Sequence, residues 1–261
     1  MRKLGAIVTL LALGLAPAPG RVEPSRLQAG YAVHWAGLPV ADLSVGAAFG
    51  DGVYSIVASG RSVGVLALFV DVTSEAAALG ARLVGGGVRP SRFRQSSDWN
   101  GRAQTARVEF APGGEAVTVD VSESRELARE PVPADLQRGP DPLSAVLLAA
   151  LQAAPATSLA AATFDGRRAL ALGLTCGAVE PVAPPAAAPW LATALRCEAT
   201  AQLTAGGLAE RRERRLRLEG PVTVWLATEL PAGLAVPIRI EVATSLGRVV
   251  AELVRLGPDG S

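Results

Sequence analysis

Hydrophobic and polar residues alternate along most of the chain, starting close to its N-terminal end. Between Leu27 and Leu38, the large side chains of Tyr31, Val33 and Trp35 fall on every second position, and smaller or polar residues occupy the positions between them. Successive side chains of a β-strand point to opposite faces, so a period of two residues is typical of a strand. The pattern therefore predicts that this segment is the first strand of a sheet.

The same alternation recurs in short runs that turn signals separate. Gly50-Asp51-Gly52 and Asn100-Gly101 favour tight hairpins, because glycine and asparagine tolerate the positive φ angles that such turns need. Near the C-terminus, Pro237 starts a strand and Gly247 makes the bend of a hairpin that we expect to close the sheet. Further strands are predicted at residues 43–49, 53–59, 72–79, 91–98, 103–110, 116–121, 194–203, 214–218, 222–227, 238–244 and 249–256, and residues 163–176 are predicted as strand with a corner at Phe164-Asp165-Gly166.

One segment lacks this alternation and predicts the main helix. Asp141 can accept hydrogen bonds from the free N–H groups of a first helical turn, and Pro142 suits the first helical position because its missing N–H costs nothing there. The residues that follow, to about position 153, are apolar almost all round, so the helix should be buried against the sheet. A second, short helix is predicted at residues 63–69.

About a dozen strands and one apolar helix determine the expected fold class. The simplest way to hide one face of these strands is a mainly β (β-rich α+β) fold, with a curved antiparallel sheet or half-open barrel and one buried helix. We expect a single domain over residues 21–261. The alternative is a fold of two lobes, divided in the polar, proline-rich stretch at residues 122–140.

The N-terminal end has the pattern of a secretory signal peptide. Arg2 and Lys3 precede an apolar run from Leu4 to Leu15, and small residues and prolines follow as far as Gly20. The apolar run is shorter than the about 20 residues that a membrane-spanning helix needs. The sequence thus predicts a leader at residues 1–20, export to the periplasm and a mature chain without a transmembrane span.

Cysteine usage agrees with export. Cys176 and Cys197 each lie in a strand-like run, and a loop rich in proline and alanine at residues 179–189 separates the two runs. In an oxidising compartment, a disulfide would tie the two strands together. The alternative is a pair of reduced, buried thiols.

The charge balance gives no sign of a polyanionic partner. The chain holds 25 basic and 24 acidic residues, and two of the basic ones, Arg2 and Lys3, belong to the predicted leader. In the one charge cluster, residues 210–219, arginines and glutamates alternate with Leu216 and Leu218, which favours a solvated strand face over a basic binding patch. We therefore predict no nucleic-acid partner.

The residue types also exclude several chemistries. His34 is the only histidine, it lies in a strand pattern, and no Gly-x-Ser-x-Gly motif accompanies it, which argues against nucleophilic serine catalysis. One histidine and two cysteines make no zinc signature, and the glycines at residues 85–87 have no phosphate-binding lysine. We predict no metal, no cofactor and no catalytic residue. The enzyme alternative is a hydrolase of envelope glycans that uses two carboxylates, and its candidates in or beside strands are Asp98, Glu109, Asp165 and Glu241.

Tryptophans are the remaining candidates for a binding role, because an aromatic side chain near a loop can line a ligand groove. Trp35 and Trp225 lie within apolar strands, where a place in the core is expected. Trp99, next to the Asn-Gly turn, is the strongest candidate for an exposed binding residue.

Five short motifs occur in the chain in a recognisable order: YAVHWAGLPVADLSV, GPDPLSAVL, FDGRR, LRCEA and VPIRIEVATSLGRVVAEL. In these motifs, over residues 27–256, the chain resembles an exported bacterial family of unknown function, DUF3108. The resemblance implies export and a β-rich fold, and no agreed activity. Many relatives carry a cysteine shortly before the FDG corner, whereas residues 158–163 hold none here, so the resemblance itself supplies no partner for Cys197.

Some envelope proteins of this kind resemble lipoprotein-carrier half-barrels, in which a curved sheet wraps an apolar cavity that a helix closes. We therefore favour a non-enzymatic protein of the cell envelope that holds an apolar ligand such as a lipid, or that supports other envelope components. In the carrier hypothesis, leucines of the helix face strand residues across a cavity; in the alternative, the same residues fill a closed core. These residues are Leu147, Leu148 and Leu151 on the helix and Trp35, Val33 and Ile240 on the strands.

Overall fold

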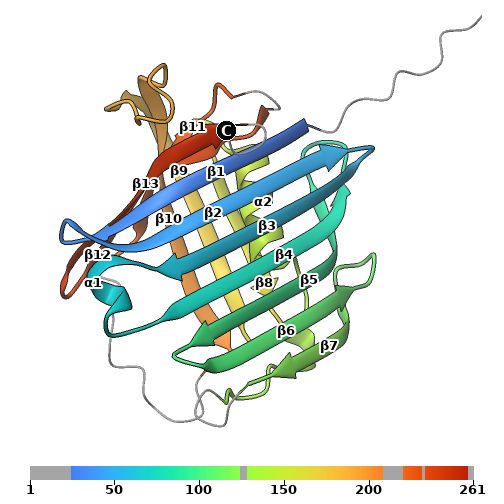
Figure 1. Ribbon diagram of the computed structural model, residues 1–261. Helices are drawn as coiled ribbons and strands as arrows, with labels where there is room; N and C mark the ends of the chain where they lie inside the picture. Colours follow the sequence, from blue (N-terminus) through green and yellow to red (C-terminus); the bar gives the residue numbers. More distant parts are fainter. Residues whose placement is uncertain (1–24, 124–127, 208–219, 231–232, 258–261) are drawn as a thin grey trace, which may run out of the picture.

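The computed structural model describes residues 25–123, 128–207, 220–230 and 233–257 (Figure 1). The predicted leader at residues 1–20 lies outside these ranges. The charged run at residues 210–219, with the strand predicted inside it, also lies outside them.

The described strands form one antiparallel sheet of 13 strands, in the spatial order β7-β6-β5-β4-β3-β2-β1-β13-β12-β11-β10-β9-β8. The first and the last of the described strands, β1 and β13, are neighbours in this order, so the C-terminal hairpin lies in the middle of the sheet. Strands from both sides of residues 122–140 belong to this same sheet. Their bounds are β1 (Ser25–Trp35), β2 (Leu38–Gly50), β3 (Val53–Ser62), β4 (Val72–Arg82), β5 (Val88–Trp99), β6 (Arg102–Phe110), β7 (Ala116–Ser122), β8 (Ser158–Phe164), β9 (Ala169–Pro181), β10 (Thr193–Ala205), β11 (Val222–Ala227), β12 (Val236–Thr244) and β13 (Gly247–Gly257).

Both predicted helices are present. The short helix α1 (Gly64–Ala67) connects β3 to β4, and the main helix α2 (Pro142–Gln152) lies in the connection from β7 to β8. A single turn of 3₁₀ helix at Ala134–Leu136 precedes α2. In the described residues, no helix is long and apolar enough to cross a membrane.

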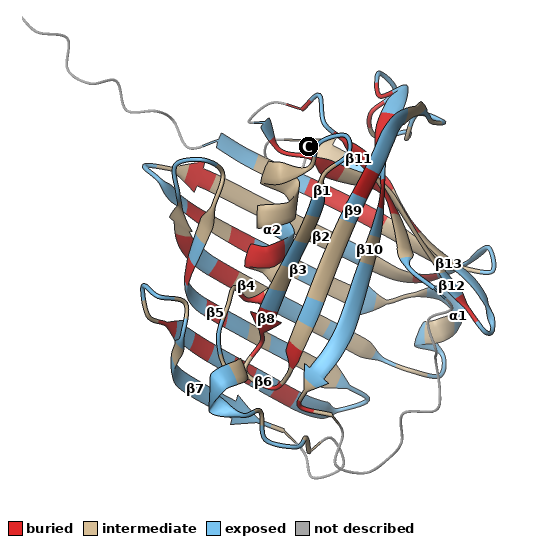
Figure 2. Ribbon diagram, turned by 180° about the vertical axis from the view of Figure 1, so that it is seen from behind, coloured by how far each residue is buried: buried red, intermediate tan, exposed pale blue. Residues whose placement is uncertain are grey.

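The sheet curves strongly without closing. Strands β1 to β7 cross one side of the molecule, β8 to β10 run at a steep angle to them on the other side, and α2 lies between the two (Figures 1 and 2). The edge strands β7 and β8 are not hydrogen-bonded to each other. This half-open barrel around one helix is the fold class that the sequence predicts.

The stretch before α2 links the two open edges. Ala116 of β7 donates its N–H to the carbonyl of Gln137 at 2.9 Å, and Phe164 of β8 donates to the carbonyl of Pro140 at 3.2 Å. An unpaired sheet edge exposes a row of backbone groups, and pairing a few of them with a covering segment protects that edge. The gap between β7 and β8 is therefore bridged by the stretch before α2, and not by direct pairing of the two strands.

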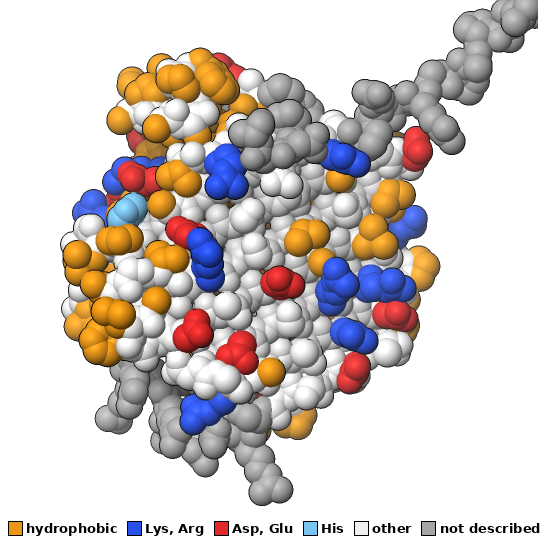
Figure 3. All heavy atoms as spheres, viewed as in Figure 1, with side chains coloured by type: hydrophobic (Ala, Val, Ile, Leu, Met, Phe, Trp, Pro, Cys, Tyr) orange, Lys and Arg blue, Asp and Glu red, His pale blue; other side chains and the backbone are white. Residues whose placement is uncertain are grey.

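Alternation sets which side chains enter the core. In β6 the buried residues are Gln104, Ala106, Val108 and Phe110, and the residues between them are exposed. One core cluster contains Val108 and Phe110 together with Leu147 of α2. Figure 3 shows the opposite, outer face of β1 to β7, where charged side chains are scattered and apolar ones are most numerous at the left margin of the view, with fewer on its right side.

Cys176 and Cys197 form a disulfide between β9 and β10. The two residues face each other directly in the strand register, and both are buried. This confirms the predicted bridge over the reduced alternative. The bridge closes a loop of 21 residues, for which the chain-entropy model gives a contribution of about 3 kcal/mol.

Asp141 caps α2 as its position predicts. Its carboxylate accepts hydrogen bonds from the N–H groups of Leu143 and Ser144, both at 3.0 Å, and from the Ser144 hydroxyl. The Ser144 hydroxyl also contacts the Tyr54 hydroxyl at 2.6 Å, which ties the helix to β3. Burial raises the pKa of the Asp141 carboxyl above its ordinary value and raises the pKa of Tyr54 to about 12.

We expect Asp141→Asn to remove a pH dependence of stability. Because burial raises the carboxyl pKa, the folded state binds the proton more tightly than the unfolded state. Protonation of Asp141 therefore stabilises the folded state at low pH, and this stabilisation is lost as the pH rises through the folded pKa. Asparagine caps a helix about as well as aspartate and does not titrate. Urea unfolding at pH 4 and pH 7 should therefore show the variant gaining stability relative to the wild type as the pH rises. A stability difference that is the same at both pH values would contradict this.

Candidate functional site

An apolar pocket of about 370 Å³ lies between α2 and the inner face of strands β8 to β12. Its size falls within the range of about 300–1,000 Å³ that is usual for ligand pockets. The walls are almost entirely apolar, and many of the lining residues are small. The strand side chains on its inner wall are Leu159, Ala161, Leu172, Leu174, Ala199, Ala201, Val222, Val224, Leu226 and Ile240.

Helix α2 divides the interior of the barrel because it has two apolar faces. Leu147 is buried in the main core, where Leu151 packs against the same cluster. The opposite face presents Ala145, Ala149 and Gln152, spaced by four and three residues, to the pocket. Since alanine side chains are short, this face leaves space between the helix and the strands.

The structure separates the binding residues that the sequence predicts. Leu148 and Ile240 both line the pocket, on the helix and on β12 respectively. Leu147 and Leu151 point to the packed core on the other side of α2. The tryptophans are not among the lining residues: Trp35 donates its indole N–H to the carbonyl of Leu246, and Trp99 lies half-exposed at the end of β5.

A second cavity, of about 490 Å³, lies beside the loop at residues 181–186. Its charged groups are paired with one another: Arg239 contacts Glu241 at 2.6 Å and Glu252 at 2.5 Å. The indole N–H of Trp225 is also used, because it donates to Glu180 at 2.6 Å. These polar groups bind one another and connect the strands to the loop, so few of them are left to bind a ligand.

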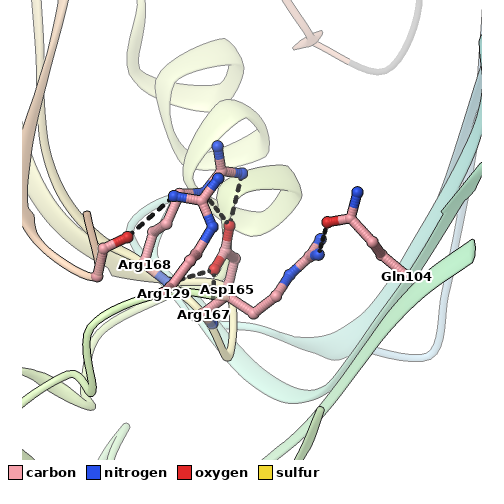
Figure 4. A network of polar contacts seen from close by, with 6 residues as sticks. Gln104, Arg129, Asp165, Arg167 and Arg168 are labelled. Atoms are coloured by element: carbon pink, nitrogen blue, oxygen red, sulfur yellow. Dashed lines mark hydrogen bonds and ion pairs between the residues drawn. The ribbon is translucent and has the colours of Figure 1, made fainter. Parts of the chain in front are cut away.

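A cluster of arginines lies at the end of the barrel where β8 and β10 finish and β9 begins (Figure 4). Arg167 and Arg168 belong to the corner between β8 and β9, and Arg129 comes from the connection before α2. Figure 4 shows Arg129 and Arg168 side by side next to Asp165, with Arg167 extending away from them toward Gln104 of β6. Arg129 is anchored by a hydrogen bond of 2.9 Å to the carbonyl of Gly206.

Asp165 organises this cluster. One carboxylate oxygen accepts from the N–H groups of Arg167 and Arg168 at 2.8 and 2.7 Å, and the other contacts the Arg168 guanidinium at 2.7 Å. The Asp165 side chain is only 1% exposed. Burial, and to a lesser extent the neighbouring Arg168 and Arg167, lower the pKa of Arg129; burial also lowers the pKa of Arg167.

A family model described as a protein of unknown function, DUF3108, matches residues 30–254. The chain belongs to the DUF3108 family. No curated protein matches this DUF3108 protein.

Two solved structures have a backbone arrangement similar to that of this DUF3108 protein. A β-barrel-like protein of the domain of unknown function DUF1849 from Brucella abortus shares 8% identity at a TM-score of 0.49, over 90% of this chain and 98% of its own. A candidate exported protein with a YmcC-like fold from Bacteroides fragilis shares 12% identity at a TM-score of 0.30, over 88% of this chain and 95% of its own.

Each of the four carboxylates proposed for the hydrolase alternative interacts with a different partner in this DUF3108 fold. Asp98 accepts the N–H of Gly101 in the β5–β6 turn, and Glu109 pairs with an arginine across the β5–β6 ladder. Asp165 is held in the arginine cluster, and Glu241 is held between Arg239 and an arginine of β13. Each carboxylate is thus engaged with its own basic or backbone partner.

Sequence reasoning missed the small residues of the pocket and the arginine cluster. Alanines such as Ala149, Ala161 and Ala199 carry no functional group, so the sequence gives no signal that they line a pocket. Arg167 and Arg168 follow directly on the FDG corner, yet their association with Arg129 depends on the path of the long connection before α2.

Proposed function

We propose that this DUF3108 protein is a non-enzymatic, exported protein of the cell envelope that holds an apolar ligand, such as a lipid chain, in the pocket between α2 and β8 to β12. The observation that carries the proposal is the pocket itself, with its volume of about 370 Å³ and its almost wholly apolar lining. Alanines occupy several positions on both the helix wall and the strand wall, and their side chains are too short to fill this space.

The lining makes an apolar occupant more favourable than water. Water inside a cavity is stable when two to four polar groups can bind it, and the polar side chains of this lining are Gln152 and Thr200. Gln152 is already engaged, since its amide donates to the carbonyl of Gly86 at 3.3 Å. Each methylene group that moves from water into such a site gains about 0.8 kcal/mol.

Two features support an extracytoplasmic location. The buried Cys176–Cys197 disulfide fits an oxidising compartment. The N-terminal residues 1–20 have the charge and apolar pattern of a leader. A binding role is favoured over hydrolysis because the candidate carboxylates each belong to a separate ion pair or turn.

Binding of the neutral, fluorescent dye Nile red to the purified chain tests the proposal. We expect saturable binding by the wild type and a loss of at least about tenfold in affinity for Ala199→Phe, because the phenyl ring enters the pocket; this corresponds to about 1.4 kcal/mol. Gln202→Phe is the matched control, since it adds the same side chain to β10 on the opposite face.

Thermal unfolding followed by circular dichroism verifies that each variant is folded. Ala149→Phe fills the pocket from the helix side and replaces Ala199→Phe if the strand variant does not fold. A wild type without saturable dye binding, or pocket variants that bind as the wild type does, would overturn the proposal. Mass spectrometry of an organic extract should in addition detect an apolar compound that is lost in the pocket variants.

A further inference from the structure

The apolar pocket continues toward the arginine cluster along one strand. Ala199 and Ala201 of β10 line the pocket, and Leu203 lies on the same face because side chains two residues apart point the same way. The pairing with β9 shifts register between Leu203 and Ala205, so Ala205 falls on the other face. Leu203 is 40% exposed, so this wall is not covered by other side chains. Gly206, the residue after Ala205, accepts the hydrogen bond from Arg129.

The length of this wall suits an extended chain. From Ala199 to Leu203 the strand advances by roughly 14 Å, at about 3.4 Å per residue, and Gly206 follows three residues later. An extended apolar chain that starts in the pocket and follows β10 therefore ends beside Arg129. Arg168, four residues from Leu172 of the pocket wall on β9, reaches the same end of the barrel.

This end of the barrel carries excess positive charge and unused hydrogen-bonding groups. Three arginines, Arg129, Arg167 and Arg168, face the two carboxylates of Asp165 and Glu123. Among the described residues, the buried Nε atom of Arg167 has no hydrogen-bond partner. The hydroxyl of Thr163, on the pocket face of β8 two residues after Ala161, is also buried without a partner. Arginine guanidinium groups are well matched to carboxylate and phosphate oxygens.

We propose that the natural ligand is an acidic amphiphile, whose apolar chain occupies the pocket and whose carboxylate or phosphate head is bound by Arg129 and Arg168. This rests on the proposed function, because it needs the pocket to hold the chain. Arg168 is the better placed of the two to change partner, since its side chain is 35% exposed while that of Asp165 is buried.

Displacement of Nile red by dodecanoate and by methyl dodecanoate, at pH 8 and low salt, tests the proposal on the full chain. Both probes carry the same apolar chain, and only the acid is charged. We expect the wild type to bind the acid at least about tenfold more tightly than the ester. Arg168→Gln should remove this preference and leave the affinity for the ester unchanged, and Arg129→Gln should do the same if the first variant does not fold. Arg196→Gln, on the outer face of β10, is the matched control and should keep the preference.

The outcomes distinguish the two proposals. If acid and ester bind equally to the wild type, the head-group site is wrong and the apolar pocket stands. If neither displaces the dye, the pocket proposal fails as well. A preference that Arg196→Gln abolishes as strongly as Arg168→Gln would be a general charge effect and would overturn the site. Inorganic phosphate that competes with dodecanoate and with the ester alike would also overturn it, because a head-group site is needed only by the acid.

Discussion

Replacing Asp165 by alanine should lower the free energy of unfolding by about 3–5 kcal/mol. The carboxylate is buried and balances three nearby arginines, so its removal leaves their positive charges in partial burial with Glu123 as the remaining acid. It also takes the acceptor away from the N–H groups of Arg167 and Arg168. An uncompensated buried charge and two orphaned donors are among the most costly changes that a single substitution can make.

Urea unfolding followed by circular dichroism measures this loss. Asp165→Asn should lie between the wild type and the alanine variant, because the amide keeps an acceptor for the two N–H groups but not the charge. Glu109→Ala is the control, since it breaks a salt bridge with Arg92 in which both side chains are exposed, and such pairs contribute about 0–1 kcal/mol. If Asp165→Ala were no more destabilising than Glu109→Ala, the cluster would not depend on its acid.

Each residue of the FDGRR corner, at residues 164–168, has a structural role. Phe164 enters the core, Asp165 holds the corner and its arginines, and Gly166 has a φ of +89°. A Cβ atom on Gly166 would lie 3.0 Å from Val108, so the corner packs closely on β6. The two arginines then reach Gln104 and Asp165. A short motif thus anchors the open edge of the barrel and places positive charge inside it.

The architecture was accessible from sequence because it depends on local pattern. In β6 the alternation of residues 104–110 fixes which side chains are buried, and turns that contain Gly101 and Gly114 form the hairpins on its two sides. The start of α2 follows from Asp141 and Pro142 alone, since capping needs only adjacent residues. The central position of the C-terminal hairpin does not follow, because the pairing of β1 with β13 joins residues more than two hundred positions apart.

The site was less accessible because it depends on tertiary placement. Helix α2 is apolar all round, so the sequence does not say which face packs and which lines a space; Leu147 and Leu148 are neighbours and lie on different sides of the helix. The pocket arises from the small side chains of residues such as Ala149 and Ala199, and no sequence pattern distinguishes these alanines from those packed in the core. The arginine cluster brings Arg129, before α2, together with Arg167 and Arg168, after it, and no local pattern in the sequence predicts that these residues are neighbours.

Phe164→Ala should destabilise the protein by about 3–5 kcal/mol, the usual cost of truncating a buried phenylalanine. Phe164 is 1% exposed and belongs to the same core cluster as Leu147 of α2 and Val108 of β6, so the cavity would open where helix, corner and sheet meet. The urea midpoint should fall without a change in the denaturant slope, because the folded and unfolded surfaces stay nearly the same. The matched control is Phe69→Ala, in which an 80% exposed phenylalanine is removed and a change within about 0.5 kcal/mol is expected. Equal effects of the two substitutions would show that the β8–β9 corner is not packed into the core, and the arginine cluster that it carries would then lose its fixed position beside the pocket.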